Sequence, residues 1–446
     1  MKIYKYIIPF LILGVLSGCQ DYLEIEPKGE VVPTNVKELG QLISGGLQTM
    51  GFGTRVCIMM SDEFTMPEES FNSIYEKNKQ AYMWKPPFDT GDDDFDWRNF
   101  YKHIYLCNYV LSQIDNAPLD GLIENDRNEV KASALTIRAY SYLELVNVYG
   151  AHYNPENASN DMAIPMLLVP DLEARLPRSS VEDVYNQVIG DLLDATVLFK
   201  SDALPYNKID PSKTGAYGIL SRAYLYKGDW ENTLKYATLA LNNHSSLYRY
   251  SDYDKSTAPE LKTIDYVSNI ENIFRRAISQ TMTGLSLKLE SDLVTLFEPG
   301  DLRLTFFTDT DDDGNKIYID TRLYAMSGIT TQEVLLSRAE ANARLGHIAE
   351  TVNDLNTLRT ERFSGTPPTL SPNDKQEALK LVLEEREKEL MFMGLRWYDM
   401  KRLVVLGEYN KTLTRTMKGE TAILAPGSDK YIVKISPAIL EWNTSL

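Results

Sequence analysis

Apolar residues recur at helical spacing along most of this chain, and in two places they form a helix–turn–helix pattern. In Tyr217–Leu241, large apolar side chains line one face of a first helix, and Gly228-Asp229-Trp230 supplies a turn. Small residues then recur on one face of a second helix, where they let two helices pack closely, as in a tetratricopeptide repeat. A second copy of this pattern is predicted for Glu333–Arg359, with Gly346 at the turn.

The rest of the chain divides into helical and irregular stretches. Further helices are indicated at four places: Trp97–Leu111, Val130–Tyr149, after a capping box of Ser179 and Glu182, and after Ser371-Pro372. Clusters of Gly, Pro and Asp and short alternating runs such as Lys316–Ile319 fill the stretches that do not read as helix: about 50–96, 150–178, 245–332 and 404–446. The predicted fold is mainly α, a helical scaffold of tetratricopeptide-type helix pairs with irregular loop and short β insertions.

The N-terminus has the pattern of an export signal. Lys2 and Lys5 precede ten apolar residues, 7–16, which are too few to span a bilayer. Small residues then lead to Cys19, as the peptidase that processes lipoproteins prefers. We therefore expect residues 1–18 to be removed, Cys19 to be lipidated, and 19–446 to form the mature domain; an ordinary signal peptide with a chance cysteine is the alternative.

Charge and cysteine content narrow the class of protein. The net charge of −17, or −19 without Lys2 and Lys5, would repel nucleic-acid phosphates. No second long apolar run is present, so the sequence predicts membrane attachment through the lipid alone. Cys57 and Cys107 are the only cysteines after Cys19, and we expect them to be buried free thiols; a disulfide between them, formed in an oxidising compartment, is the alternative.

Several stretches, in order along the chain, match the motifs of one known family. They are Cys19–Pro27, Ser61-Asp62-Glu63, Trp97–Asn108, Arg138-Ala139-Tyr140, Leu145–Gly150 and the motif-rich Glu385–Arg402. Together they resemble the SusD/RagB family of nutrient-binding lipoproteins. Met393 stands where that family usually has Glu, and the C-terminal Asn443–Leu446 is shorter than the usual tail.

The resemblance implies a fold and a role. It implies a SusD-like scaffold on the outer face of the outer membrane, paired with a SusC-like TonB-dependent transporter. The ligand would be a glycan or oligosaccharide, or, in some members, a peptide. A protein-interaction scaffold and a surface hydrolase are the alternatives from other classes.

The sequence offers little for catalysis. The four histidines are scattered, and the chain has no H-E-x-x-H, G-x-S-x-G or phosphate-loop motif. Paired carboxylates for glycoside hydrolysis would need a known separation, which the sequence does not give. We therefore expect a binding protein that requires no cofactor, rather than an enzyme.

One acidic stretch resembles a calcium loop. Carboxylate and amide oxygens alternate before and after Gly314, and hard oxygen ligands with a glycine at the sharp turn suit Ca²⁺. An acidic hairpin turn is the alternative. The candidate ligands are Asp309, Asp311, Asp313, Asn315 and Asp320.

Aromatic side chains are the expected platform for a ligand, since flat rings bury apolar area while polar neighbours fix orientation. Trp84 is the best candidate for an exposed ring because it lies in a stretch that does not read as helix. For each aromatic a place in the core is the competing interpretation. The full set of candidates is Tyr82, Trp84, Phe88, Tyr318 and Tyr324.

Overall fold

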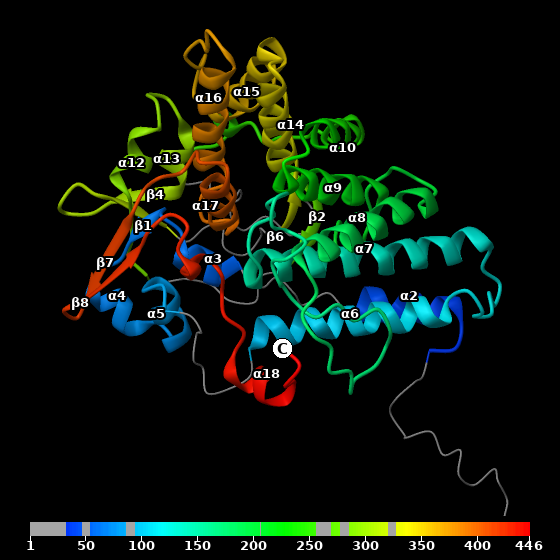
Figure 1. Ribbon diagram of the computed structural model, residues 1–446. Helices are drawn as coiled ribbons and strands as arrows, with labels where there is room; N and C mark the ends of the chain where they lie inside the picture. The colour runs from blue at the N-terminus through cyan, green and yellow to red at the C-terminus, as the bar shows by residue number, and fades with distance from the viewer. Residues whose placement is uncertain are drawn as a thin grey trace, which may run out of the picture.

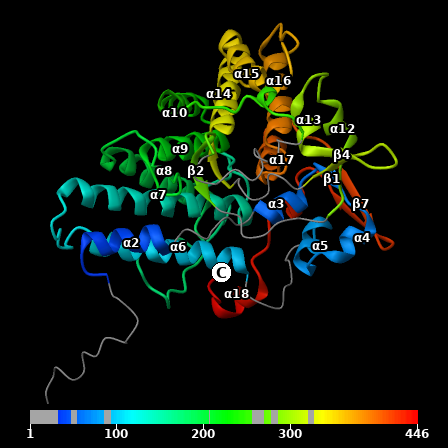
Figure 2. The ribbon, with the colours of Figure 1, turned by 180° about the vertical axis from the view of Figure 1, so that it is seen from behind.

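The long helices stack in a row in which each packs on its neighbours (Figure 1). The computed structural model describes residues 33–46, 54–85, 94–205, 207–255, 269–276, 285–319 and 327–446. The row runs through α6 (Phe95–Gln113), α7 (Glu124–Tyr149), α8 (Val181–Leu198), α9 (Lys213–Lys227), α10 (Trp230–Asn243), α14 (Thr331–Leu345), α15 (Ile348–Arg362) and α16 (Lys375–Glu389). Figure 2 shows the same order from behind.

Both predicted helix pairs are confirmed as α9–α10 and α14–α15. Each first helix ends on a glycine in the left-handed region, Gly228 at φ 76° and Gly346 at φ 84°. A side chain with a Cβ is strained there, so glycine makes the tight turn. Asp229 then caps α10, because its Oδ1 accepts a hydrogen bond from the Asn232 N–H at 3.1 Å.

Two predicted helix starts are wrong by one to three residues. The N-cap of α8 is Ser180, whose Oγ accepts from the Asp183 N–H at 3.0 Å, and not Ser179. The N-cap of α16 is Asp374, which accepts from two backbone N–H groups, and not Ser371. In both cases a nearby residue of the capping type provides the better geometry, which spacing alone does not distinguish.

The stretches expected to be irregular also contain short helices. These are α3 (Thr54–Met60), α4 (Glu68–Ser73), α5 (Glu76–Tyr82), α12 (Ser291–Thr295), α13 (Leu302–Phe307) and α18 (Pro437–Trp442). Most have one or two turns, too few for a helical repeat of apolar residues to be recognised. Outside those stretches lie α2 (Val36–Gly46) and α17 (Leu395–Val405).

Among the residues that the structure describes, short antiparallel strands form three small sheets beside the helices. The strands are β1 (Phe64–Thr65), β2 (Asn272–Arg276), β3 (Leu287–Leu289), β4 (Thr308–Thr310), β5 (Lys316–Tyr318), β6 (Ser327–Thr330), β7 (Leu413–Met417) and β8 (Glu420–Leu424). Their orders are β1-β3-β5-β4, β2-β6 and β7-β8. The predicted short strand at Lys316–Ile319 is confirmed as β5.

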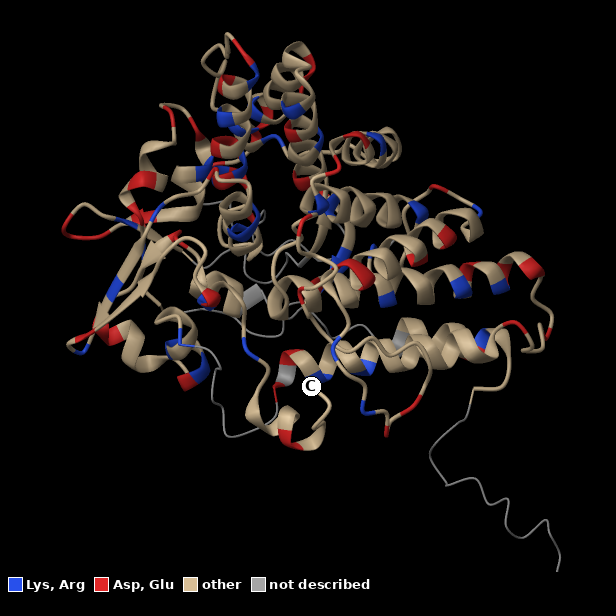
Figure 3. Cartoon of the chain, viewed as in Figure 1, with Lys and Arg blue, Asp and Glu red and all other residues tan. Residues whose placement is uncertain are grey.

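Buried ion pairs join α13, α15 and α16, and we call this group the core network: Asp301, Arg303, Arg362, Glu385 and Glu389. The Arg303 guanidinium is fully buried and lies 2.6 Å from an Asp301 oxygen and 3.0 Å from a Glu389 oxygen. Figure 3 shows basic and acidic segments alternating on α14, α16 and α17. Pairing is what makes such charges tolerable inside a protein, because an unpaired buried charge is very costly.

The two cysteines are confirmed as buried and free. Burial raises the pKa of Cys57 and of Cys107 to about 12, so both remain neutral thiols.

Candidate functional site

The expectation of an exposed ring at Trp84 is wrong. The side chain is 1% exposed, and its Nε1–H donates to the Met60 carbonyl at 2.8 Å. The Arg415 guanidinium lies 4.3 Å from the ring centroid. Trp84 is among the residues that line a small pocket, but a ring this deeply buried offers no platform for a ligand. Trp84 directly follows the short helix α5, and the residues at the end of this helix are buried in the core.

Two further candidate rings also lie in the core. Tyr82 is 1% exposed, and its hydroxyl accepts from the Met66 N–H at 3.1 Å. Tyr318 is 2% exposed and stacks on Phe392 with ring centroids 3.8 Å apart. The inward face of β5 carries Tyr318, which the alternation of that strand allows. Phe88, Tyr324 and Cys19 lie outside the described residues.

The acidic turn at 309–315 is a closed hydrogen-bonded hairpin turn. Asp311 Oδ1 accepts from the N–H groups of Asp313 at 3.1 Å and Asn315 at 2.7 Å, and its Oδ2 accepts from the Asn315 amide. Asp309 pairs with Lys255. Asp320 lies outside the described residues, so calcium binding here stays a prediction. Within the described part of the chain no three His, Cys, Asp or Glu side chains are grouped as metal ligands.

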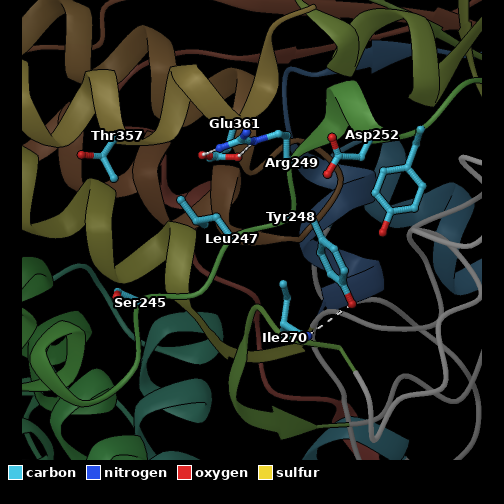
Figure 4. Close-up of a pocket in the computed structure, with 9 residues that line it drawn as sticks. Ser245, Leu247, Tyr248, Arg249, Asp252, Ile270, Thr357 and Glu361 are labelled. Atoms are coloured by element: carbon cyan, nitrogen blue, oxygen red, sulfur yellow. Dashed lines mark hydrogen bonds and ion pairs between the residues drawn. The ribbon is translucent and has the colours of Figure 1, made fainter.

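An open polar pocket of about 480 Å³ lies between the loop after α10 and the α15 helix (Figure 4). Its size falls within the range of small-molecule sites, roughly 300–1,000 Å³. We call it the polar pocket; its lining residues are Ser245, Leu247, Tyr248, Arg249, Asp252, Tyr253, Ile270, Thr357 and Glu361. Hydroxyls, carboxylates, a guanidinium and two phenol rings therefore face one hollow.

The backbone of Tyr248 is fixed to the core behind the pocket. Its N–H donates to Glu271 at 3.0 Å, and its carbonyl accepts from Arg362 at 2.8 Å. Arg362 belongs to the core network, where it also meets Glu389 at 2.9 Å. The buried ion pairs thus hold the pocket loop in place.

The two tyrosine rings of the pocket are only partly buried. They meet edge to face with centroids 6.4 Å apart. The Tyr248 hydroxyl accepts from the Ile270 N–H at 3.3 Å, which leaves its own hydrogen free to donate. Burial raises the pKa of Tyr248, so that hydrogen stays in place at neutral pH.

The charged groups of the pocket differ in how they are paired. Arg249 forms a two-point ion pair with Glu361, with nitrogen–oxygen distances of 3.0 and 3.1 Å. The Asp252 carboxylate is exposed and has no ion-pair partner among the described residues. Its backbone is held by a hydrogen bond from its N–H to the Arg249 carbonyl at 3.1 Å.

A second, larger groove has the opposite character. It measures about 710 Å³ and lies between the start of α6, the loop 165–176 and α18. Its walls are mainly apolar, with Trp97, Tyr101 and Trp442 among them, and Trp442 is 48% exposed. The Arg175 guanidinium lies 5.7 Å from the Trp442 centroid. We call it the apolar groove.

Two of the four histidines, His103 and His152, are buried and poorly placed for acid–base chemistry. Burial, with Arg276 nearby, lowers the pKa of His103 to about 3. Burial also lowers the pKa of His152 well below its usual value. Both imidazoles therefore stay neutral near pH 7 and lie inside the fold.

Sequence reasoning missed the polar pocket because its residues come from three separate segments. Tyr248, Arg249 and Asp252 lie within the stretch 245–332, which was expected to carry loops, but no spacing links them to Thr357 and Glu361 on α15. The signal available was the cluster of tyrosines after a predicted repeat helix, since loops on a rigid scaffold tend to carry binding groups.

Two family profiles match this chain. Residues 21–225 match SusD-like proteins described as "Starch-binding associating with outer membrane", and residues 307–434 match the SusD family. No helix within the described ranges is both long and apolar enough to cross a membrane.

Known proteins resemble the chain over nearly its whole length. SusD-like protein P2 of Formosa agariphila is 25% identical, over 90% of each chain, and SusD-like protein P38 of the same organism is 23% identical. A SusD superfamily structure from Bacteroides vulgatus covers 92% of this chain and 98% of its own, with a TM-score of 0.75 at 17% identity. Surface glycan-binding protein A from Bacteroides uniformis shares the fold with a TM-score of 0.69 at 16% identity, over 92% and 98% of the two chains. The profiles, the relatives and the mainly helical fold agree, and the chain belongs to the SusD/RagB family.

Proposed function

We propose that this protein captures glycans at the cell surface and passes them to a SusC-like TonB-dependent transporter in the outer membrane. The observation that carries the proposal is the polar pocket, in which two partly exposed tyrosine rings stand beside hydroxyl, carboxylate and guanidinium groups. A pyranose presents an apolar face and a rim of hydroxyls, and such a site meets both.

The proposal includes binding without turnover. Glycoside hydrolysis uses two carboxyl groups, one to donate a proton and one to attack or to activate water. In the polar pocket both Glu361 oxygens accept hydrogen bonds from Arg249, which leaves Asp252 as the available carboxylate. The names of two relatives by fold, a SusD-like carbohydrate binding protein and a surface glycan-binding protein, also favour a binding role.

A screen of glycan and peptide libraries against the soluble form Gln20–Leu446, which lacks the lipidation site, tests the proposal. We expect saturable binding of a glycan and no product by chromatography after long incubation. Product formation would identify a hydrolase instead, and saturation by peptides alone would identify a peptide-binding member. Failure of every small ligand would favour an interaction scaffold.

Membrane attachment through Cys19 is the second part of the proposal, and it is supported by the leader pattern of residues 1–19. Acyl chains on Cys19 would be the anchor, since two or more chains hold a protein stably at a membrane. The Cys19→Ala variant should remain uncleaved or leave the membrane fraction, and it should lose lipid labelling. Unchanged membrane association with unchanged labelling would contradict lipidation at this residue.

A further inference from the structure

The charges that line the polar pocket do not balance. Three of its nine lining residues carry a formal charge: Arg249, Asp252 and Glu361. One cation thus stands against two carboxylates. The pocket therefore carries one net negative charge at its wall, on a protein whose total charge is already −17.

The single cation is committed to a protein partner. Arg249 directs its Nε and one terminal nitrogen at the two Glu361 oxygens, in the parallel geometry that suits a guanidinium and a carboxylate. An acidic ligand would have to displace Glu361 to gain the same contact, and a free carboxylate would then remain in the pocket. The paired Arg249 guanidinium therefore attracts anionic ligands only weakly.

The cation behind the pocket is neutralised as well. Arg362 lies below the tyrosine loop, but it meets Glu271 at 2.7 Å and Glu389 at 2.9 Å. At the edge of the same loop, Lys255 pairs with Asp309. These cations therefore do not offset the Asp252 charge.

Asp252 can serve hydroxyl groups well and anions badly. An ionised carboxylate only accepts hydrogen bonds, so it takes the O–H of a sugar directly. The Tyr248 hydroxyl supplies a neutral donor on the other side, since it accepts from Ile270 and keeps its own hydrogen for a ligand. A uronate or sulfate group at that place would bring two negative charges together without a counter-ion.

We propose that the polar pocket selects uncharged glycans and discriminates against glycans with uronate or sulfate groups, with Asp252 as the specificity-determining residue. This inference rests on the proposed glycan-binding function and extends it to the ligand class. Two exposed charges several ångströms apart in water interact weakly, so we expect a preference of about three- to tenfold, reduced by salt.

Matched pairs of oligosaccharides test the inference, for example an oligogalacturonide and its methyl ester, or a sulfated oligosaccharide and its desulfated form. Isothermal titration calorimetry with the soluble form Gln20–Leu446 at low ionic strength measures the dissociation constant of each oligosaccharide. In each pair that binds, the uncharged oligosaccharide should bind more tightly than the acidic one. Asp252→Asn should bring the ratio of the two dissociation constants close to one. The control Asp115→Asn removes an exposed carboxylate that follows α6 and does not line the polar pocket, so it should leave the ratio unchanged.

The outcomes separate the two claims. An acidic member that binds as tightly as its uncharged partner, or a ratio that Asp252→Asn does not change, overturns the charge selection and leaves glycan binding standing. Saturable binding of no glycan, charged or uncharged, overturns the proposed function and this inference together. Tighter binding of amino-sugar oligomers than of neutral ones would support the negative character of the pocket.

Discussion

Arginine–carboxylate pairs occur in two adjoining regions of this protein, and they do different work in each. In the core network Arg303 and Glu389 are both fully buried, and their removal from water is offset by close pairing. In the polar pocket the side chain of Arg249 is 57% exposed, and its pairing with Glu361 is open to solvent. The first pair type fixes the fold, while the second forms the wall of a site.

The family motif lies in the core network and not in the polar pocket. The stretch Glu385–Arg402 made the family recognisable, yet most of its charged residues are buried among helices. It reaches the candidate site only indirectly, through Arg362 and the Tyr248 carbonyl. The motif therefore supports the pocket loop and leaves the choice of ligand to other residues.

The largest effect should come from breaking the core network. Arg303→Met leaves three buried carboxylates without their shared cation, and we expect a loss of about 3–5 kcal/mol in the free energy of unfolding. The matched change in the pocket, Arg249→Met, should cost about 1 kcal/mol or less, because exposed ion pairs contribute little. Chemical denaturation measures both. Equal losses would erase the distinction between the two regions.

Trp84 should behave as a core residue. Trp84→Ala is expected to cost about 3–5 kcal/mol of stability, because a buried ring and its hydrogen bond to Met60 are lost. The control Trp442→Ala removes an exposed ring and should shift the melting temperature little. A stable Trp84→Ala protein with weakened ligand binding would return Trp84 to the list of binding residues.

Glu63 should make the stability of the core depend on pH. Burial raises the pKa of Glu63 from 4.5 to about 8. The Phe392 N–H donates to Glu63 Oε1 at 2.7 Å, and the Ser61 hydroxyl lies 2.8 Å from Glu63 Oε2. The Ser61 hydroxyl also lies 2.9 Å from the Ile58 carbonyl; by donating its one hydrogen there, it can accept the proton of a neutral Glu63.

The free energy of unfolding should fall as pH rises, because the folded protein holds one proton more than the unfolded chain. Between pH 4.5 and about 8 the folded protein holds a proton on Glu63 that the unfolded chain releases, so stability falls as pH rises. Glu63→Gln removes this dependence while it keeps the hydrogen-bonding shape. The difference between the variant and the wild type should grow by up to about 1.4 kcal/mol per pH unit across this window. Parallel pH profiles for the two proteins would contradict a neutral Glu63.

Calcium at the 309–320 turn should give the smallest effect, because the turn is exposed and already held by Asp311 hydrogen bonds. A bound ion would raise the melting temperature in calcium relative to chelator, and Asp311→Ala would abolish the difference. Calorimetry with the same transition in both conditions, for wild type and variant alike, would rule out the metal.

Much of the fold could be predicted from local pattern, and the site could not. The two helix pairs were recognisable because glycine turns and small residues recur at fixed spacing, as at Gly228 and Gly346. Burial of Trp84 could not be recognised in this way, because it depends on one short helix and on Arg415, which is distant in sequence. The polar pocket joins Tyr248 to Glu361, more than one hundred residues away in sequence.

Glycan capture in the polar pocket is tested by comparing one aromatic residue from the polar pocket with one from the apolar groove. A glycan identified by the library screen is titrated into wild type, Tyr253→Ala from the polar pocket and Trp442→Ala from the apolar groove, with a thermal melt of each protein as control. We predict that Tyr253→Ala weakens binding more than about tenfold, roughly 1.4 kcal/mol or more, while Trp442→Ala leaves it unchanged. Unchanged binding by a folded Tyr253→Ala protein, with loss of binding by Trp442→Ala, would place the ligand in the apolar groove and rule out capture in the polar pocket.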